Sequence, residues 1–461
     1  MHEEFRSQAA EQLCFPSKKQ ILDQTLSVCS KCYKIIPAQI VENNGKIFLE
    51  KECCKKEVFL LENDAEFYKK ATLPFVIDRN FIEVDKFRTD EELKEKLVDT
   101  ASIICLTVNA RCNLRCPICY LRAGPLTDAD KQACLNEPSL SEIISIMRKH
   151  RNKLVGIVGG EPTLREDLPD IIKIIRKSGN VPFFATNGIK LLDKEYAKKI
   201  KEAGVSFVTI WFDGFKSEAN RILRGEDFLE LKMKILKNLR DEGLQVNLLS
   251  VIEKGLNEDQ IPLLLRFACM CKKFVRNVTF LPVYLGDQPI KEMTTTSDIL
   301  KNLDFFFGLN FTEQFIEEKK MSYNVHKLMK KLFGKMLKNE FSYILSSSIY
   351  LKVRGKNLRP LFSLEEVKKI NGALDKINSA KNRLDMISLM IKNFGVFLNP
   401  RLFKLGAFFI LDGLNLARTS ERFHSDILKL NFTAISSILK EDFKRKPLQE
   451  DAIITMEVSR E

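Results

Sequence analysis

Three cysteines close together constrain this chain more than any other feature of its sequence. Cys112, Cys116 and Cys119 stand in the run NARCNLRCPICYLRAG with the spacing C-x3-C-x2-C. Three thiolates at this spacing can ligate three irons of a four-iron, four-sulfur (4Fe-4S) cluster and leave the fourth iron without a protein ligand. Such an iron can bind a small molecule, which distinguishes a catalytic cluster from one that only transfers electrons. The sequence therefore predicts a 4Fe-4S cluster at these three cysteines.

Two other interpretations of the same cysteines are a zinc site and three unrelated thiols. Structural zinc requires a fourth Cys or His close by, and no histidine lies between His2 and His150. The chain has 12 cysteines in 461 residues, so this spacing arises rarely by chance. Both observations favour the iron–sulfur interpretation.

A glycine-rich turn follows the cysteine run about forty residues later in the sequence. We predict a strand over Val155–Val158, then the turn Gly159-Gly160-Glu161-Pro162, then an amphipathic helix. Two glycines allow a backbone to approach a ligand closely, and the Glu161 carboxylate can meet a cationic amine. The turn alone is also compatible with an ordinary strand-to-helix connection. At the carboxyl end of a strand after the cysteine run, we expect Gly159, Gly160, Glu161 and Pro162 to bind a cofactor.

Strands and helices alternate between residues 99 and 290. Six apolar strand segments, from Ile103–Val108 to Asn277–Leu285, are separated by helical patterns such as Leu168–Lys177 and Lys194–Ala203. Units of this kind build parallel sheets whose functional residues gather at the carboxyl ends of the strands. We therefore predict an α/β fold in which residues 99–290 form a partial (β/α)6 barrel, about three-quarters of a TIM barrel.

The N-terminal segment, residues 1–62, carries a second group of cysteines. Cys29 and Cys32 form a C-x2-C pair, and Cys53 and Cys54 follow a predicted hairpin whose turn reads Asn-Asn-Gly. Two such pairs across a hairpin predict a zinc-ribbon or rubredoxin-like site for one zinc or iron ion. Cys54 is the weaker fourth ligand, because neighbouring residues rarely both point at one metal, and Cys14 is its alternative. Residues 63–98 are predicted to be a linker.

The motifs together resemble the radical S-adenosylmethionine (SAM) superfamily over roughly residues 100–290. The cysteine run, the GGEP turn, and the FATNGIKL and FDG segments carry this resemblance. It implies that one 4Fe-4S cluster and SAM are the cofactors, and that the turn contacts the SAM amine. It also implies reductive cleavage of SAM to a 5′-deoxyadenosyl radical that abstracts a substrate hydrogen. The electron would come from a reduced flavodoxin- or ferredoxin-type donor.

Three polar residues near the ends of later strands become candidates for SAM contacts on the same grounds. Asn187 follows the third predicted strand, Asp213 follows the fourth, and Ser250 lies near the end of the fifth. Each residue alone is as compatible with a structural role as with binding. Their shared position at strand carboxyl ends favours binding, and for Asp213 the resemblance suggests a ribose hydroxyl as the partner.

The N-terminal cysteines and the core motifs together look like one branch of the superfamily. That branch contains archaeal tetraether lipid synthase, which couples alkyl chain ends, and the class D-type (dihydropterin) radical SAM methylases, which transfer a carbon unit to a pterin. This sequence departs from the branch because it has no cysteine after Cys271, where relatives carry further cysteines for auxiliary clusters. Couplings that need such clusters are therefore less expected here.

Residues 291–461 are predicted to form a mainly helical, basic C-terminal domain. Lys and Arg are frequent in Lys319–Arg359, and Leu402–Leu411 is the most apolar stretch. With a net charge of +13, these features suit a peripheral contact with anionic lipid, although such a pattern more often belongs to a packed helical domain with outward lysines. No apolar run is long enough to span a bilayer, and the start does not resemble a signal peptide, so we expect a cytoplasmic protein.

Three functional hypotheses follow from these patterns. The first is a radical SAM enzyme that forms a C–C bond or transfers a methyl group on a lipid or other apolar substrate. The second is a radical SAM enzyme that modifies a peptide or a small heterocycle of the pterin type. The third is a degenerate family member that binds metal or RNA without catalysis, although the intact cysteine run and GGEP turn disfavour it. No nucleic acid partner is expected for the first two.

Overall fold

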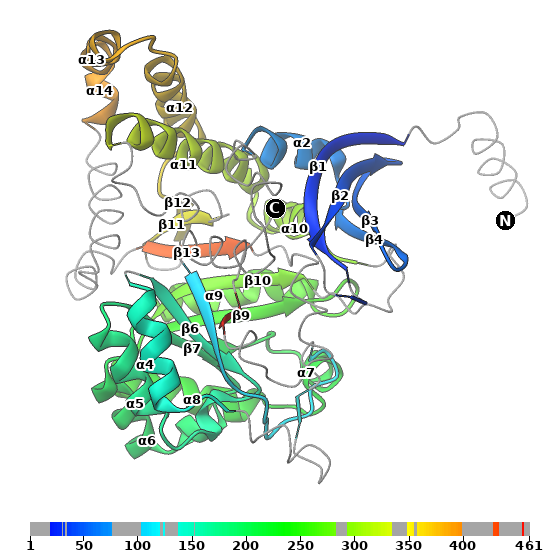
Figure 1. Cartoon of the computed structure of the whole chain (residues 1–461), viewed down its shortest axis with the longest axis vertical. Coiled ribbons are helices and arrows are strands. Elements are labelled where there is room, and N and C mark those ends of the chain that lie inside the picture. Colours follow the sequence, from blue (N-terminus) through cyan, green and yellow to red (C-terminus); the bar gives the residue numbers. More distant parts are fainter. Residues whose placement is uncertain are drawn as a thin grey trace, which may run out of the picture.

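The computed structural model describes most of the N-terminal sheet, the β/α core and part of the C-terminal region. The described residues are 19–29, 31–32, 35–75, 103–119, 123–124, 137–151, 153–282, 293–333, 348–354, 357–398, 427–432 and 454–455. They form a small antiparallel sheet, a large curved sheet with helices around it, and a separate group of C-terminal helices (Figure 1). The stretch Leu402–Leu411, part of the basic run and Cys14 lie outside the described residues.

Four N-terminal strands form an antiparallel sheet in the order β1-β2-β3-β4. They are β1 Gln20–Val28, β2 Ile35–Asn43, β3 Lys46–Glu52 and β4 Lys56–Glu62. The predicted hairpin joins β2 to β3, where Asn44 and Gly45 have φ angles of 51° and 71°. Positive φ at both central residues is what a two-residue type I′ turn requires. Helix α2, Ala65–Ala71, covers one face of this sheet and buries Tyr68 against it.

Six parallel strands of the core lie side by side in chain order, from β5 to β10. They are β5 Ile103–Asn109, β6 Leu154–Gly159, β7 Val181–Thr186, β8 Phe207–Trp211, β9 Val246–Ile252 and β10 Val275–Pro282. The intervening helices are α4 Leu140–Lys149, α5 Leu168–Lys177, α6 Lys194–Ala203, α7 Ser217–Arg224, α8 Leu229–Asp241 and α9 Ile261–Met270. The predicted α/β class with a partial (β/α)6 barrel is confirmed.

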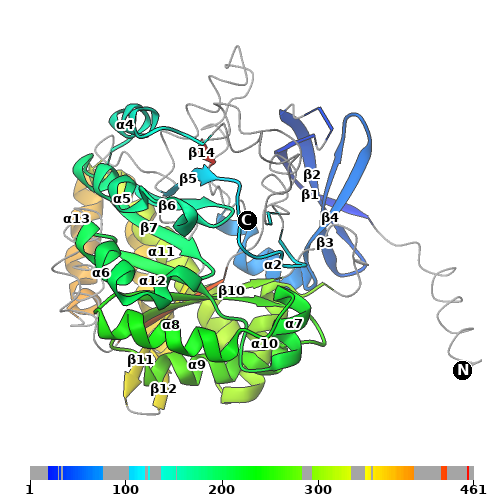
Figure 2. The ribbon, with the colours of Figure 1, turned by 90° about the horizontal axis from the view of Figure 1, so that it is seen from below.

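The main hydrophobic core lies between the outer face of this sheet and its helices, which follow the outside of the curved strands in Figure 2. Helix α5 shows why the sequence folds this way. It buries Leu168, Ile171, Ile172 and Ile175, a spacing that places all four on one side of a helix. On the strands, every second residue, such as Ile157 and Phe184, packs into the same core. The remaining alternate residues face the inside of the curved sheet.

The C-terminal region contributes both helices and sheet edges. Its helices are α10 Thr296–Phe307, α11 Phe311–Phe333, α12 Leu364–Asn378, α13 Arg383–Lys392 and α14 Phe394–Phe397. Its strands are β11 Ser348–Arg354, β12 Asn357–Pro360, β13 Ile427–Phe432 and β14 Ile454–Thr455. Strand β13 pairs in parallel with β10, and β14 pairs antiparallel with β5. Both edges of the six-stranded core are therefore covered by C-terminal strands, which the sequence did not predict.

A buried carboxylate joins the N-terminal sheet to the C-terminal helices. Glu62, the last residue of β4, accepts hydrogen bonds from the Oγ1 of Thr295 and, at 2.6 Å, from the Oγ of Ser297. These donors lie at the start of α10, where unpaired backbone N–H groups favour a negative charge. Next to it, the side-chain amide of Asn63 donates to Asp298 at 2.7 Å. This junction fixes the sheet of β1–β4 on the core.

Among the described helices, none has the length and apolar character needed to cross a bilayer.

Candidate active site

The three cysteines of the first motif lie on a loop that leaves the carboxyl end of β5. The backbone N–H of Cys112 donates to the carbonyl of Gly124 at 3.3 Å, and that of Cys119 donates to the carbonyl of Cys116 at 3.0 Å. All three thiols are partly exposed. Among the described residues, the groups that bring ligand atoms within 4.8 Å of one another are the four N-terminal cysteines and not these three. The three thiols are therefore not gathered as closely as a site for a single ion requires.

The glycine turn after β6 is required by close packing against this cysteine loop. A Cβ on Gly159 would lie 2.3 Å from the carbonyl oxygen of Asn109, and one on Gly160 would lie 2.1 Å from that of Arg111. Gly159 also has a φ of 143°, which side chains disfavour. The backbone N–H of Glu161 donates to the carbonyl of Arg111 at 2.6 Å. The glycines therefore hold the turn against the chain that carries the cysteines, and binding of a cofactor by Gly159 and Gly160 stays a prediction.

Glu161 is buried, with 1% of its surface exposed, and its carboxylate accepts several hydrogen bonds from the protein. Its Oε1 accepts from the backbone N–H of Thr163 at 3.1 Å and from the hydroxyls of Thr163 and Thr186, both at 2.6 Å. Its Oε2 accepts from the backbone N–H of Asn187 at 2.7 Å. Pro162 begins a short 3-10 helix that Glu161 caps. Glu161 thus ties the end of β6 to the end of β7, and only Oε2 retains acceptor capacity for a ligand.

Asn187 connects this turn to the cysteine loop. Its side-chain amide donates to the Oδ1 of Asn113 at 2.7 Å and lies 4.0 Å from the Sγ of Cys112. Because its backbone N–H is bound to Glu161, one residue contacts both motifs. The structure therefore brings Glu161, Asn187 and Cys112 together, as their strand-end positions suggested.

Asp213 is engaged by an arginine that the sequence did not single out. The Oδ2 of Asp213 accepts from the Nε of Arg224 at 2.6 Å, and its Oδ1 accepts from the Nη2 at 2.9 Å and from the backbone N–H of Val251 at 2.9 Å. The guanidinium also lies 4.7 Å from the ring centre of Trp211 and within hydrogen-bonding reach of Cys116. Asp213 therefore holds Arg224 beside the cysteine loop.

A second buried cation, Lys232 on α8, lies in the same region. Only 7% of its surface is exposed, and its Nζ donates to the backbone carbonyl of Asn187 at 2.5 Å. Burial and the positive charge of Arg224 lower the pKa of Lys232 to about 8. Among the described residues, no carboxylate lies within ion-pair distance of it. Arg224 and Lys232 therefore place two cations beside the cysteine loop, where Asp213 and Glu161 supply two carboxylates.

The two cations match the chemistry that the thiols need. Burial raises the pKa of Cys112 to about 11 and also raises the pKa of Cys116, so both are protonated when no cation or metal is bound. The Arg224 guanidinium acts in the opposite direction on Cys116. Thiolates bound to iron carry negative charge, which nearby cations stabilise. The donor set and its surroundings therefore fit an anionic iron–sulfur cluster.

Ser250 lies apart from these contacts. Alternation along β9 places it on the side of Leu248 and Ile252, which pack into the main core. Its hydroxyl is buried and has no hydrogen-bond partner among the described residues. The structure therefore shows no contact between Ser250 and Glu161, Asn187 or Arg224.

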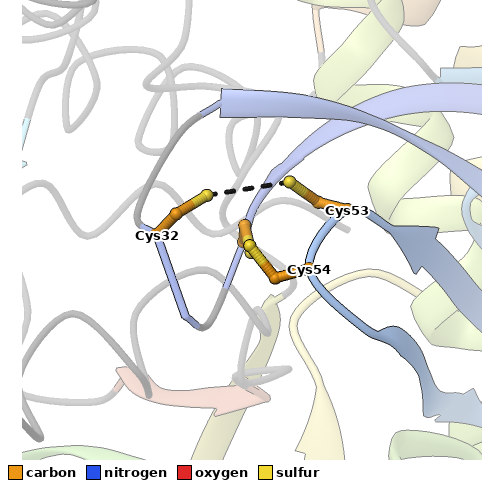
Figure 3. Close-up of side chains that lie close together, drawn as sticks. Cys32, Cys53 and Cys54 are labelled. Carbon is orange, nitrogen blue, oxygen red and sulfur yellow. Dashed lines mark hydrogen bonds between the residues drawn. The ribbon is translucent and has the colours of Figure 1, made fainter.

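The N-terminal cysteines converge at one end of the small sheet. The sulfurs of Cys29, Cys32, Cys53 and Cys54 lie within 4.8 Å of one another, and those of Cys32 and Cys53 are 3.7 Å apart. Figure 3 shows Cys32, Cys53 and Cys54 facing each other from the two chain segments. Cys54 joins the group although it is the neighbour of Cys53, because Cys53–Lys55 form a bend between β3 and β4, where side chains do not alternate. Four thiols at this separation suit one tetrahedral metal ion.

Backbone donors make one of these thiols acidic. The N–H groups of Cys32, Cys54 and Lys31 lower the pKa of Cys29 to about 6, whereas hydrogen bonds to Cys32 and Cys29 raise the pKa of Cys53 to about 12. Thiols this close share protons, because several thiolates repel one another without a cation. Binding of a metal ion would remove that repulsion and release protons.

Comparisons with known proteins agree with both sites. Residues 106–268 match the family described as the Radical SAM superfamily, and residues 21–55 match the HMPTM N-terminal zinc ribbon domain. The chain is 34% identical over 273 residues to 7,8-dihydro-6-hydroxymethylpterin dimethyltransferase of Methanocaldococcus jannaschii, which covers 56% of this chain and 53% of that protein.

Two further relatives match the core. The chain is 32% identical over 157 residues to Fe-coproporphyrin III synthase of Methanosarcina barkeri, covering 34% of this chain and 38% of the relative. It is 30% identical over 213 residues to GTP 3′,8-cyclase of Aquifex aeolicus, covering 45% and 66%. The alignment with the M. jannaschii protein spans about half of that relative's length.

Proposed function

The chain belongs to the radical SAM superfamily, and we propose that it is an enzyme that reductively cleaves SAM and abstracts a hydrogen atom from a small substrate. When bound, a 4Fe-4S cluster supplies the single electron that converts SAM into methionine and a 5′-deoxyadenosyl radical. The protein would receive that electron from a reduced flavodoxin- or ferredoxin-type donor. The residues of the chain would hold the cluster and SAM and exclude water from the radical.

We assign the cluster to Cys112, Cys116 and Cys119. The observation that carries the proposal is the docking of their loop on the Gly159-Gly160 turn, through the hydrogen bond from Glu161 to Arg111. Cys112 lies near Glu161 and Cys116 lies near Arg224, so a ligand bound at the open iron would meet both a carboxylate and a guanidinium.

The arrangement of charges matches the two ends of an amino acid. We propose that the backbone of the glycine turn and the Oε2 of Glu161 hold the SAM amine, and that Arg224 holds the SAM carboxylate. Asp213 would then act by positioning Arg224, in addition to any contact with the ribose. Asn187 would hold the cysteine loop against the turn. Ser250, which faces the core, is the weakest of the original candidates.

We further propose that the substrate is a small heterocycle of the pterin type and that a carbon unit is transferred to it. Support comes from the relative named as a hydroxymethylpterin dimethyltransferase and from the match of residues 21–55 to the ribbon of the HMPTM family. Both the ribbon and the core therefore resemble proteins of that kind. We propose one zinc or iron ion for the ribbon.

A direct experiment is anaerobic reconstitution of the protein with iron and sulfide, followed by reduction in the presence of SAM. We expect 5′-deoxyadenosine as a product, detected by mass spectrometry, and its amount should rise when 7,8-dihydro-6-hydroxymethylpterin is added. Protein that carries a full cluster but forms no 5′-deoxyadenosine under any of these conditions would contradict the proposed function.

An apolar substrate or a membrane contact is a second candidate, favoured by one surface. Leu384, Ile387, Ile391, Phe394 and Leu398 are each more than half exposed along α13 and α14. An exposed apolar stripe of this kind suits the boundary of a lipid layer. The basic run Lys319–Arg359 offers less free positive charge for a lipid contact than its sequence suggested, because its first two lysines contact other residues of the domain. Lys319 is buried, and Lys320 pairs with Asp375 at 2.8 Å.

Sedimentation with anionic vesicles tests this candidate. Binding that is lost in the double variant Leu384→Ser and Ile391→Ser would support a membrane contact, with Ser388→Ala as the control on the same helix. Absence of binding by the parent protein would leave the soluble heterocycle as the better substrate class.

A further inference from the structure

The inner face of the curved sheet is arranged in layers that the strand register defines. Thr107 pairs with Val158 across β5 and β6, Ala185 pairs with Thr209 across β7 and β8, and Asn247 lies between Thr209 and Asn277. Their alternate neighbours on the same strands, such as Ile210 and Leu248, pack into the outer core. The middle layer of the inner face is therefore polar on four of its six strands.

A short chain of hydrogen bonds crosses this layer. The Nδ2 of Asn247 donates to the Oγ1 of Thr209 at 3.3 Å, and the Oγ1 of Thr279 donates to the Oδ1 of Asn247 at 3.2 Å. These bonds fix the orientation of the Asn247 amide. They leave it one N–H donor and one acceptor lone pair, and they leave the Thr209 hydroxyl its own proton to donate.

Two further polar groups of the layer have no partner among the described residues. The Oγ1 of Thr107 and the Oδ1 of Asn277 are buried and accept or donate no hydrogen bond among the described residues. Thr209 and Asn247 are themselves only 4% and 9% exposed. Buried polar groups are nearly always satisfied in folded proteins. Such an accumulation of unused donors and acceptors indicates that a ligand or water completes them.

Size and charge restrict what this ligand can be. The layer carries no charged side chain on its described strands, so it offers no counter-ion for an ionised group. Ala185 and Val158 are small and remain partly exposed, so the layer is reachable from β6 and β7. One layer below, the rings of Phe183 and Phe207 stack with their centres 4.7 Å apart. These rings place apolar surface below the layer, and the fixed amide and hydroxyl groups suit the polar edge of a flat, uncharged ring.

We propose that Thr209 and Asn247 form a subsite that binds the hydrogen-bonding edge of a flat, uncharged, nitrogen-containing ring of the substrate. The proposal rests on the proposed function, because it places this ring inside the barrel below the cysteine loop. It deepens that function by assigning substrate recognition to the middle of β8 and β9, and it disfavours a saturated alkyl chain. An alkyl chain would leave the Oγ1 of Thr107, the Oδ1 of Asn277 and the remaining donors of Thr209 and Asn247 without a partner.

The test measures binding of 7,8-dihydro-6-hydroxymethylpterin by anaerobic equilibrium dialysis, with reconstituted protein and SAM present. Thr209→Val and Asn247→Leu remove hydrogen-bonding groups at nearly constant volume, and Thr209→Ser keeps the hydroxyl as the matched control. We expect the dissociation constant to rise at least tenfold in each of the first two variants and to change less than about threefold in Thr209→Ser. Iron content and the thermal unfolding midpoint serve as controls for folding.

The outcomes separate this inference from the proposed function. Unchanged pterin affinity in folded Thr209→Val or Asn247→Leu would overturn the subsite, as would a parent protein that cleaves SAM but does not bind the pterin. Tighter binding of tetradecanol by Thr209→Val would also overturn it, because that result would identify an apolar site. The reconstituted protein could also fail to cleave SAM and still bind the pterin, with weaker binding in Thr209→Val and Asn247→Leu. That result would support the subsite and refute the proposed function.

Discussion

At the scale of single residues, Glu161 shows how one carboxylate can organise a site. It receives hydrogen bonds from Thr163, Thr186 and Asn187, which belong to two different strand ends. Its charge is therefore needed for the geometry of the glycine turn, whether or not it also contacts a ligand.

Replacing Glu161 with Gln should reduce both stability and SAM affinity. The amide has one acceptor oxygen instead of two, so either the hydroxyl donors or the Asn187 N–H lose their partner. We expect a loss of about 1–3 kcal/mol in the free energy of unfolding, and a comparable weakening of SAM binding. Urea denaturation and calorimetric titration with SAM measure the two effects. Glu166→Gln is the control, since that side chain is 94% exposed, and equal behaviour of the two variants would contradict this role.

Lys232 should influence the reduction potential of the cluster. Its buried positive charge stabilises the additional negative charge of the reduced cluster, so Lys232→Met should shift the midpoint potential to more negative values, on the order of tens of millivolts. A redox titration followed by electron paramagnetic resonance measures the shift. Lys234→Met on the same helix removes an exposed charge and should leave the potential unchanged. An unaltered potential in Lys232→Met would show that Lys232 is only structural.

At the scale of elements, the N-terminal hairpins build a metal site that strand alternation alone does not predict. Cys53 and Cys54 both face the other pair because they occupy a bend outside the strands. The sheet of β1–β4 has its own small core, which includes Ile40 and Leu49, and a metal ion would crosslink the β1–β2 and β3–β4 connections.

Metal analysis of the purified protein tests the ribbon. We expect one zinc or iron ion per chain beyond the cluster iron, and Cys32→Ser and Cys54→Ser should each release it, because a tetrahedral thiolate site tolerates loss of a ligand poorly. Cys271→Ser, at the end of α9, is the matched control and should retain the ion. If Cys54→Ser retains the ion, a residue other than Cys54 supplies the fourth ligand.

The β/α core was predictable from the sequence because its elements alternate with clear apolar periodicity. Helix α5, for example, spans Leu168–Lys177, as its apolar periodicity predicted. The cysteine run and the GGEP turn were recognisable because their spacing is local. Arg224 and Lys232 were not, since on amphipathic helices they look like ordinary surface charges. Only the packing of α7 and α8 on the cysteine loop shows that they are buried.

The C-terminal strands could not be predicted for a different reason. Strand β14 has two residues, and β13 pairs with β10 from about 150 positions away in the sequence. Nothing in their local composition specifies such partners, because pairing depends on an edge that exists only after the barrel has formed. The sequence therefore indicated a helical C-terminal domain and missed its contribution to the sheet.

At the scale of the whole molecule, Glu62 connects the ribbon sheet to the barrel. Burial raises its pKa to about 7, although the hydroxyls of Ser297 and Thr295 act in the opposite direction. A carboxyl whose pKa is higher in the folded state than in the unfolded state binds more protons when folded. The stability it contributes is therefore present at low pH and is lost as the pH rises from about 4.5 to about 7.

Substitution of Glu62 by Gln should remove this pH dependence. The parent protein should lose more stability than Glu62→Gln between pH 5 and pH 8, with a difference on the order of 3 kcal/mol. Urea denaturation at the two pH values gives the comparison, and subtracting the two proteins cancels all other titrating groups. Glu66→Gln, whose side chain is 72% exposed, should behave like the parent. Identical pH slopes in the parent and Glu62→Gln would contradict a buried, titrating junction.

The central claim, that Cys112, Cys116 and Cys119 hold a catalytic cluster, is tested most directly by counting iron after anaerobic reconstitution. We predict about four irons and four sulfides above the ribbon metal in the parent protein, and loss of all of them in the triple Ala variant. The variant should keep the ribbon metal, because Cys29, Cys32, Cys53 and Cys54 form a separate site. Four irons and undiminished cleavage of SAM in the triple variant would contradict the account.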